Sequence, residues 1–520
     1  MRGDGRCPSV GCVEFRSTRE DQDQSSYRRR STMSEHGITR QLARFVQRTD
    51  FTNLPEKVVE QAKDYVLDCI GGTIGSYGVP EGVAISKVAR EFGTGGECTI
   101  LPTGQRAPAT AATYVNSKLS NFIDNEETLY NYHHIGGVPV YPALHVAEEM
   151  GASGKDFLTA VVLGYEFAYR FAQNYNKMRI NDDGSLDFAK TSGLGFNVIT
   201  ASVAASKVLG LDTEGIQNAM GIAGYYMTIP IIYKFHFTTP FNMTKYQDTG
   251  WFAFSGLMSA LFTRHGCTAD LEILDDYGDN SLWKAFGMLE FNFDTMISDL
   301  GGKWGIMEMG IKPYPCCRWY HTPIYMLSKV MKDKGLKPDQ IEGVTVGVHP
   351  LVAHSEAFSR VANWPQVKEK NAVAAQFSLP YCLACSAYDV PAGPQWQLPS
   401  TMNDPRLGDF CKKVTIAVDE KCEEKMMAYI RSGQPLGRVM TQIHNTVEVI
   451  SNKGRFKETA EYIYGDTYDP DHRLSRDELK QKFVRNSSAI LTQKTMTKVI
   501  DMVYDIDSCE SINDFMALFR

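Results

Sequence analysis

The chain has 520 residues and a formal net charge of −7, and its 43% hydrophobic and 22% charged residues are typical of a globular protein. An acidic balance does not fit a protein that binds nucleic acid or a membrane surface through clustered lysine and arginine, so any positive charge that meets an anionic ligand must be local. No apolar run approaches the roughly 18 residues of a membrane span, and the length predicts two or three domains.

Residues 1–32 differ from the rest, with Arg28-Arg29-Arg30, five acidic residues and little that could pack. We expect a disordered extension there. A mitochondrial transit segment is the alternative, although the acidic residues argue against it. The twelve cysteines are scattered, which indicates free thiols in a reducing compartment and therefore a cytoplasmic protein.

Helical periodicity dominates from residue 36 to about residue 290. Proline early in the second helix and Asp212 before a later one are typical of helix starts. An Ala- and Ser-rich segment predicts a tightly packed central helix. The predicted helices cover residues 38–46, 53–70, 111–123, 142–150, 157–174, 198–209, 216–223 and 245–265.

The apolar period then changes to two, which predicts strands with one buried face. The alternating residues are Val344, Val346 and Val348, then Val414, Ile416 and Val418, then Val447 and Val449. A helical stretch over residues 372–387 lies between the first two strands, and Leu474-Ser475-Arg476-Asp477-Glu478-Leu479 caps a return to helix.

The pattern predicts a mainly α fold with an α+β part. We place a large all-helical domain over residues 33–308, a smaller inserted α+β lid domain over residues 309–465, and C-terminal helices over residues 466–520 that return to the helical domain. A cleft between two such domains is where small-molecule sites usually form.

One polar segment carries Asp124, Thr128 and His134, followed by Gly136-Gly137. Glycines let backbone N–H groups approach an anion, and a histidine can act as general acid or base near neutral pH. A solvated helix–loop–helix junction is the alternative interpretation of this segment.

Two lysines complete the candidate site. Lys245 precedes an apolar helix, and Lys312 lies in a loop stiffened by Pro313 and Pro315. Exposed lysines without a ligand are the alternative in both places. Together with the first segment they supply two cations, a carboxylate, a hydroxyl and an imidazole, which suits the binding of a small polycarboxylate and proton transfer beside a carboxyl group, without a cofactor.

Other chemistries find little support. Adjacent histidines such as His133 and His134 rarely bind one ion, and no H-E-x-x-H motif is present, so we expect no metal. Cys382-Leu-Ala-Cys385 stands inside a helical pattern and is expected to pack in the core. No phosphate-binding glycine loop and no G-x-S-x-G elbow occurs, so nucleotide cofactors and serine hydrolysis are unsupported.

The chain resembles the MmgE/PrpD family, which includes 2-methylcitrate dehydratase, cis-aconitate decarboxylase and iminodisuccinate epimerase. The resemblance runs from about residue 38 to residue 518. The segments that carry it are Leu54-Pro55, Leu67-Asp68-Cys69-Ile70-Gly71, Ala204-Ala205-Ser206-Lys207, Thr244-Lys245, Lys312-Pro-Tyr-Pro-Cys-Cys with His321, and Phe377-Ser-Leu-Pro-Tyr381.

The resemblance implies a helical domain with an α+β lid, usually as a homodimer. It implies a catalytic Asp, a Thr four residues later and a His ten after the Asp, together with two lysines. The matching residues are Asp124, Thr128, His134, Lys245 and Lys312. We also assign Gly136, Gly137 and Tyr381 to substrate binding.

Two positions depart from cis-aconitate decarboxylases. A second active-site histidine is missing before the Ala-rich helix, where Phe188-Ala-Lys190-Thr191 stands, and Cys317 replaces a histidine in the lysine loop. Residues around 175–187 and 277–305 are extra and could reshape the pocket. The two losses argue against decarboxylation and leave a broader lyase or isomerase open.

We therefore expect a cofactor-independent hydro-lyase that dehydrates a 2-methylcitrate-like hydroxy acid. Lys245 and Lys312 would hold carboxylates, His134 would move the proton, Asp124 would orient His134, and Thr128 would hold a substrate oxygen. The alternatives are a dicarboxylate isomerase or epimerase, a cis-aconitate-type decarboxylase, and an inactive carboxylate-binding scaffold dimer.

Overall fold

The structure is a computed structural model. It describes residues 37–93, 95–129, 133–176, 178–181, 186–189, 191–229, 241–245, 247–354, 372–432, 443–466 and 472–520. The predicted disordered extension at residues 1–32 lies outside these residues. Within the described ranges, no helix is both long and apolar enough to cross a bilayer.

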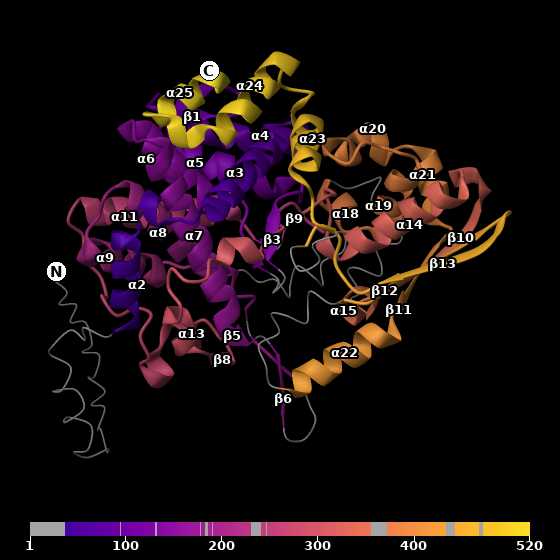
Figure 1. The fold of residues 1–520 in the computed structure, drawn as a ribbon, viewed down its shortest axis with the longest axis horizontal. Coiled ribbons are helices and arrows are strands. Elements are labelled where there is room, and N and C mark those ends of the chain that lie inside the picture. The colour runs from indigo at the N-terminus through magenta and orange to yellow at the C-terminus, as the bar shows by residue number, and fades with distance from the viewer. Residues whose placement is uncertain are drawn as a thin grey trace, which may run out of the picture.

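The first part of the chain is a bundle of helices around a common core (Figure 1). Helix α8 runs through it with every residue buried except Lys207. A Cβ atom added at Gly256 of α11 would lie 2.4 Å from the Cβ atom of Ala201, so small residues let α8 and α11 pack closely, as predicted. The helices are α2 (Ile38–Arg48), α3 (Glu56–Tyr77), α4 (Pro80–Lys87), α5 (Ala109–Phe122), α6 (Val140–Met150), α7 (Gly154–Asn174), α8 (Asn197–Val208), α9 (Thr213–Tyr225) and α11 (Thr249–Arg264).

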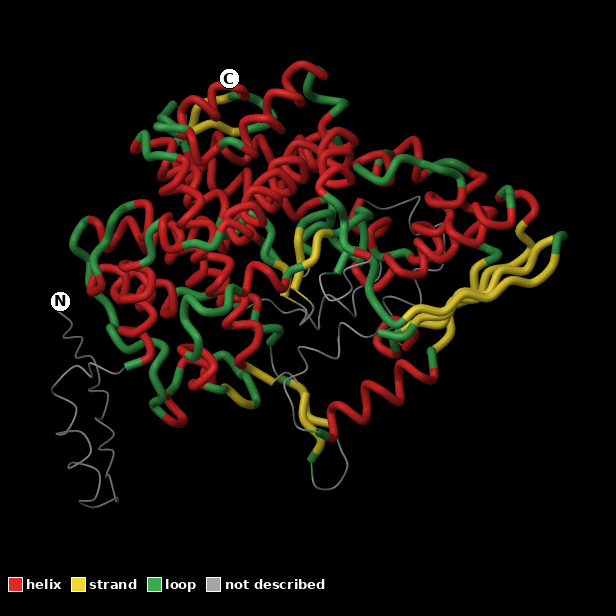
Figure 2. Tube along the Cα trace, viewed as in Figure 1, coloured by secondary structure: helices red, strands yellow, loops and turns green. Residues whose placement is uncertain are grey.

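The second part is built on a four-stranded sheet in the order β11-β10-β12-β13, visible as the yellow strands at one side of Figure 2. Strands β10 (Ile341–Val348) and β11 (Val414–Val418) are parallel, whereas β12 (Asn445–Ser451) and β13 (Gly454–Ala460) run antiparallel to their neighbours. Helix α14 (His321–Lys334) packs on the sheet, and α19 (Leu379–Ala387) packs against α14. The mainly α fold with an α+β part is therefore confirmed.

The C-terminal helices, yellow in Figure 1, return to the first part of the chain and lie against its helical bundle. Helix α23 (Arg476–Ser487) packs against α3, as does α24 (Gln493–Tyr504), and α25 (Ile512–Met516) packs on α6. A capping box starts α23, with the Glu478 carboxylate accepting from the Ser475 N–H at 2.8 Å. The packing of α23 on α3 brings side chains of α23 close to the buried face of α3.

A short three-stranded ladder joins the two parts in the order β4-β3-β9. Strand β3 (Glu127–Leu129) pairs with β4 (His133–His134) on one side and with β9 (Gly310–Ile311) on the other. The register sets Thr128 opposite His134 and also opposite Gly310. The ladder thereby brings the loop that begins at Lys312 next to the segment from Asp124 to His134.

The extra segments form small additions at the edge of the bundle. Strand β5 (Tyr175–Asn176) pairs with β8 (Glu290–Phe291), and β6 (Met178–Ile180) pairs with β7 (Leu186–Phe188). The β6 strand also contacts α22 (Glu420–Arg431) of the second part. These segments therefore form a further connection between the two parts of the chain.

Candidate active site

Asp124 occupies a turn that ends helix α5 and starts strand β3. Its backbone φ is +58°, a left-handed conformation that Asp tolerates better than most residues, and its N–H donates to the Asn121 carbonyl oxygen at 3.0 Å. The helix predicted over residues 111–123 ends at Phe122, and an extended strand follows it after the turn. Thr128 therefore reaches the site through ladder pairing with His134.

Lys245 also has a left-handed backbone, with φ of +56°, and its N–H donates to the Asn242 carbonyl oxygen at 3.2 Å. Helix α11 begins only at Thr249, where the Asp248 carboxylate accepts from the Trp251 N–H at 3.0 Å. The predicted helix start at Lys245 is therefore wrong by four residues. The turn directs the lysine side chain inward, and Lys245 is only 4% exposed.

The two lysines meet at the Asp124 carboxylate. The Lys245 ammonium lies 2.9 Å from Asp124 Oδ1, and the Lys312 ammonium lies 3.0 Å from Asp124 Oδ2. Lys245 also donates to the Asn121 carbonyl oxygen at 2.5 Å. All three charged side chains are buried, so one carboxylate holds two cations that are supplied by different parts of the chain.

Glu126 links this pair of lysines to the imidazole. Its Oε1 atom lies 3.7 Å from Lys312 Nζ and 3.4 Å from His134 Nδ1, and it also accepts from the Asn121 side-chain amide. The His134 carbonyl oxygen accepts from Asn197 at 3.0 Å, which fixes the strand position of the histidine. The sequence analysis did not select Glu126. Its position two residues after Asp124 could have indicated it, because both carboxylates then lie just before the same strand, β3.

The charges in this cluster balance. Burial alone would raise the pKa of Asp124, but the two lysines outweigh it and hold that pKa well below its usual value. Burial also raises the pKa of Glu126, but Lys312 and His134 together lower it by more. Burial lowers the pKa of Lys312, but Asp124 and Glu126 more than restore it. Burial lowers the pKa of Lys245 by more than Asp124 and Glu126 raise it. The cluster thus sets two lysines against two carboxylates.

His134 is the neutral member of the cluster. Burial and then Lys312 lower its pKa to about 4, more than Glu126 raises it. Its side chain remains 19% exposed. A neutral imidazole at pH 7 can accept a proton, which is the state that a general base requires.

A second ion pair lies directly behind the cluster. Lys482 of α23 lies 2.5 Å from Asp68 Oδ1 of α3, and it donates at 2.5 Å to the carbonyl oxygen of Asn125. Burial raises the pKa of Asp68 to about 6 despite Lys482. Lys482 therefore holds the backbone between Asp124 and Glu126 through the Asn125 carbonyl group.

A cavity of about 10 Å³ borders Lys312, enough for about one water molecule. Side chains and backbone from both parts of the chain surround it. They are Thr128, Gly310, Ile311, Lys312, Arg318, His321, Ile463, Tyr464, Gly465 and Asp466. Thr128 and Lys312, which the sequence analysis selected, therefore border the same space.

Three predicted substrate-binding residues lie in the packing instead. The Gly137 N–H donates to Ser120 at 2.8 Å, and a Cβ atom there would lie 2.4 Å from the Tyr141 ring, so this glycine serves close packing rather than anion binding. Gly136 adopts a φ of +55° in the same turn. Tyr381 is fully buried and donates to the Trp396 carbonyl oxygen at 2.6 Å, which places it in the core of the second part.

Two groups of residues in the described part of the chain have metal-ligand composition. Asp124, Glu126 and His134 offer atoms within 4.8 Å of one another, but the ammonium groups at Asp124 would repel a cation. The other group is Cys98, His145 and Glu148.

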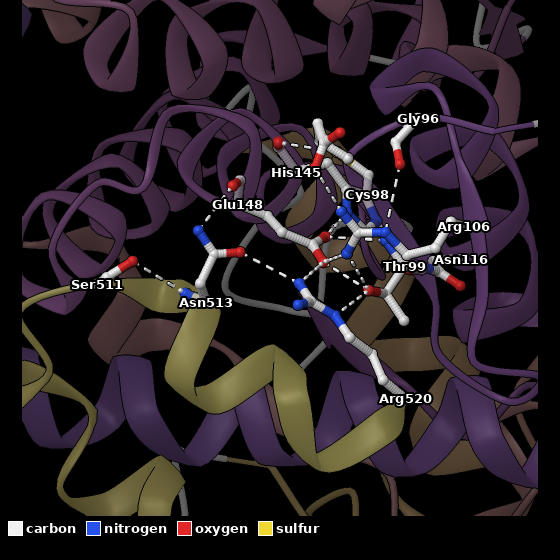
Figure 3. Close-up of polar contacts among 11 residues, drawn as sticks. Gly96, Cys98, Thr99, Arg106, Asn116, His145, Glu148, Ser511, Asn513 and Arg520 are labelled. Atoms are coloured by element: carbon white, nitrogen blue, oxygen red, sulfur yellow. Dashed lines mark hydrogen bonds and ion pairs between the residues drawn. The ribbon is translucent and has the colours of Figure 1, made fainter.

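In the second group, Glu148 is already bound by protein groups (Figure 3). Its Oε1 atom lies 2.9 Å from Arg520 and accepts from the Thr99 hydroxyl at 2.5 Å, and its Oε2 atom lies 3.1 Å from His145 Nδ1. Burial also raises the pKa of Cys98 far above its usual value. Neither group favours a metal ion, because cationic side chains already occupy the carboxylates.

A mainly α bundle joined to an α+β unit, with two lysines, an acid pair and an imidazole gathered where they meet, defines an enzyme of the carboxylate-acting lyase class. The chain belongs to the MmgE/PrpD family: the MmgE/PrpD N-terminal domain matches residues 40–285, and the MmgE/PrpD C-terminal domain matches residues 314–506.

Several curated relatives cover nearly the whole chain. The chain is 23% identical to a cis-aconitate decarboxylase of Aspergillus terreus over 94% of this chain and 96% of that protein. It is 23% identical to the cis-aconitate decarboxylase-like protein oryM of Aspergillus oryzae over 93% of this chain and 97% of that protein. The human cis-aconitate decarboxylase is 23% identical over 93% of this chain and 94% of its own length.

Proposed function

We propose that the protein is a cofactor-independent lyase that acts on a small di- or tricarboxylate, and that it dehydrates a 2-methylcitrate-like hydroxy acid. The observation that carries the proposal is the meeting of Lys245 and Lys312 at one buried carboxylate, with neutral His134 beside it. Cations fixed in a dry site stabilise the dianionic, enediolate-like species that forms when a proton leaves the carbon next to a carboxylate.

In the proposed reaction, the substrate carboxylates bind the two lysine ammonium groups and compete with Asp124 for them. His134 takes the proton from the α carbon, and the electron pair of that C–H bond passes into the carboxylate to form the enediolate-like species. That pair then forms the new C=C bond as the C–O bond breaks, while the imidazolium protonates the hydroxyl, which departs as water. Thr128 holds a substrate oxygen from its strand position opposite His134.

We infer that Glu126 orients His134, a role that the sequence analysis gave to Asp124. Glu126 Oε1 is 3.4 Å from the imidazole, whereas both Asp124 oxygens face lysines at 2.9 and 3.0 Å. Asp124 instead fixes the distance between the two cations. Glu126 stabilises the imidazolium that forms after proton transfer.

Decarboxylation of a cis-aconitate-like substrate is the second candidate, and the three relatives favour it. In that reaction a C–C bond breaks, carbon dioxide leaves, and a proton is added to the carbon that keeps the electron pair. Cys317 stands where the resemblance implies a histidine, and burial raises the pKa of its thiol to about 12. A thiol of that pKa is a poor proton donor at neutral pH, which favours dehydration.

Incubation in deuterated water with 2-methylcitrate or cis-aconitate, followed by NMR, tests the proposal. Loss of water from 2-methylcitrate supports it, loss of carbon dioxide from cis-aconitate selects the second candidate, and exchange of a C–H bond alone indicates an isomerase. Lys312→Met and Lys245→Met should each lower turnover by about 30- to 1,000-fold, since such contacts contribute about 2–4 kcal/mol. Lys329→Met is the matched control, because that lysine is 43% exposed. Unchanged turnover in both lysine variants would refute the site.

A homodimeric assembly, a cytoplasmic location and domain boundaries at residues 308 and 465 stay predictions from the sequence.

A further inference from the structure

Two buried glutamines of the second part contact the end of the helix that precedes Asp124, and the sequence analysis gave neither a role. Gln376 ends helix α18 (Ala372–Gln376), and Gln397 ends the short 3-10 helix Pro394–Gln397. They are only 1% and 0% exposed. A buried amide destabilises the fold unless it finds hydrogen-bond partners, so its partners indicate which groups it holds in place.

Gln397 bridges the two segments that supply Asp124 and Lys312. Its Nε2 atom donates at 2.8 Å to the carbonyl oxygen of Ile123, the residue directly before Asp124. The same atom donates at 3.1 Å to the carbonyl oxygen of Pro315, three residues after Lys312. The two N–H groups of one amide therefore join the turn at the end of helix α5 to the lysine loop of the second part.

The contacts of the Gln397 amide favour one orientation. Its Oε1 atom accepts from Gln376 Nε2 at 2.9 Å, while its Nε2 atom faces the two carbonyl oxygens. A flipped amide would set its oxygen against two carbonyl oxygens and its nitrogen against the Gln376 donor. All three contacts would then be repulsive, so the amide can act only as a donor to both segments.

The residue before Gln397 fixes the 3-10 helix in the second part. The Trp396 ring stacks on the Tyr314 ring of the lysine loop, with centroids 5.8 Å apart and planes 13° apart. The Trp396 indole N–H donates to the Val390 carbonyl oxygen at 2.9 Å, and its own carbonyl oxygen accepts from Tyr381 at 2.6 Å. Gln397 is therefore attached to a well-packed support.

We propose that Gln397 is a positioning residue of the active site, whose amide sets the separation between the Asp124 carboxylate and the Lys312 ammonium group. This inference rests on the proposed function, in which Lys312 binds a substrate carboxylate. The ammonium group lies 3.0 Å from Asp124 Oδ2, and Gln397 links the backbone segments that carry both groups. A displacement of about 1 Å at an active site can lower a rate by about 100-fold, so this link affects catalysis without touching the substrate.

Gln397→Met tests the proposal, because methionine keeps most of the side-chain volume and removes both donors. We expect kcat for the acid that the NMR assay identifies as substrate to fall by about 10–100-fold. A crystal structure of the variant should show Lys312 Nζ and Asp124 Oδ2 separated by more than about 4 Å, the limit of an ion pair. Gln397→Asn keeps an amide that is one methylene too short to reach both carbonyl groups and should recover only part of the rate. If Gln397→Met does not fold, the same two measurements on Gln397→Asn decide the question.

Gln376→Met is the matched control for the loss of a buried amide. Gln376 Nε2 donates two hydrogen bonds, to Gln397 Oε1 at 2.9 Å and to the Phe122 carbonyl oxygen at 2.7 Å, but neither reaches the lysine loop. The Gln376 backbone carbonyl, which accepts from the Cys317 N–H at 3.0 Å, is kept in the variant. The urea midpoint should therefore fall about as far as in Gln397→Met, whereas kcat should stay within about threefold of wild type.

The outcomes separate this inference from the proposed function. A lower kcat and a longer ion-pair distance in Gln397→Met, with neither in Gln376→Met, support the inference. If Gln397→Met loses stability but keeps the kcat or the ion-pair distance of wild type, Gln397 is only structural and the inference is overturned. Equal losses of kcat in the two variants would also overturn it, because the loss of either buried amide would then be enough. If the wild-type chain turns over none of the acids, the proposed function fails, whereas the crystallographic distance still decides whether Gln397 sets the ion pair.

Discussion

Replacing Lys482 by Met tests whether the ion pair behind the active site holds the fold together. The substitution removes the cation but keeps most of the side-chain volume. It leaves Asp68 buried, at 2% exposure, without the ammonium group that lies 2.5 Å away. It also removes the donor to the Asn125 carbonyl oxygen.

Removing one partner of a buried ion pair costs about 3–5 kcal/mol. About 1–3 kcal/mol of that cost comes from the Asn125 carbonyl group, which loses its hydrogen-bond donor. We therefore expect the free energy of unfolding to fall by about 3–5 kcal/mol at pH 7.

The pH dependence gives the prediction a distinctive form. The folded-state pKa of Asp68 is already raised to about 6, so its stabilising protonated form is lost as the pH rises through that value. Without Lys482 this pKa rises further, and the folded variant keeps its proton to a higher pH than wild type. The difference in the free energy of unfolding between wild type and variant should therefore grow by about 1 kcal/mol per pH unit between pH 6 and 8.

Urea denaturation of wild type and variants at pH 6, 7 and 8 measures this deficit. Lys480→Met on the same helix is the control, because Lys480 is 38% exposed and its carboxylate partner lies 3.8 Å away, and it should change stability by less than about 0.5 kcal/mol. The double variant Asp68→Leu, Lys482→Met should recover most of the loss, since no buried charge remains. A Lys482→Met deficit equal to that of the control, or one that is flat in pH, would refute the reasoning.

Two further predictions concern acid stability and the end of the chain. Burial lowers the pKa of His134 to about 4 and that of His321 to about 3. Between pH 7 and 5 these histidines therefore bind protons in the unfolded chain but stay neutral in the folded chain. Each should lower the free energy of unfolding by about 2 kcal/mol as the pH falls from 7 to 5. Thermal melts over this range should show the loss, and a midpoint that rises on acidification would contradict it. Arg520→Ala removes a donor 2.9 Å from buried Glu148 and should lower stability by about 1–3 kcal/mol in urea titrations, whereas an unchanged midpoint would show that Arg106 and Thr99 suffice.

Periodicity in the sequence predicted most of the regular structure. Alternating valines marked β10, β11 and β12, and the structure pairs Val344 with Val414 and Val346 with Ile416. Strand β13 was not predicted, because Gly454–Ala460 alternates polar residues with few apolar ones and most of it is exposed. An edge strand of this kind has no buried face strong enough to show in a pattern.

The charged cluster was predicted in part. The types and spacing of Asp124, Lys245 and Lys312 indicated the chemistry. The two left-handed turns were not predicted, because they occur at residues other than glycine, and a lysine rarely adopts that conformation. Glu126 resembled one of several solvated acids, because its cationic neighbour Lys312 comes from much later in the chain.

Lys482 was missed for a similar reason, since its helix is rich in charge. One signal was available: Leu479, Lys482, Phe483 and Asn486 follow helical spacing and are all buried, so a lysine stands on the inward stripe.

The origin of the ion-pair partners has a consequence for how the chain folds during synthesis. Asp124 can pair with Lys245 as soon as the helical bundle has been made, but Asp68 leaves the ribosome early and its partner Lys482 emerges only with the last helices. A bundle that closed over Asp68 before then would bury a carboxylate without its cation, which is strongly unfavourable. The face of α3 that carries Asp68 is therefore expected to stay hydrated until α23 packs on it, and amino-terminal fragments that lack α23 should be less stable than the full chain.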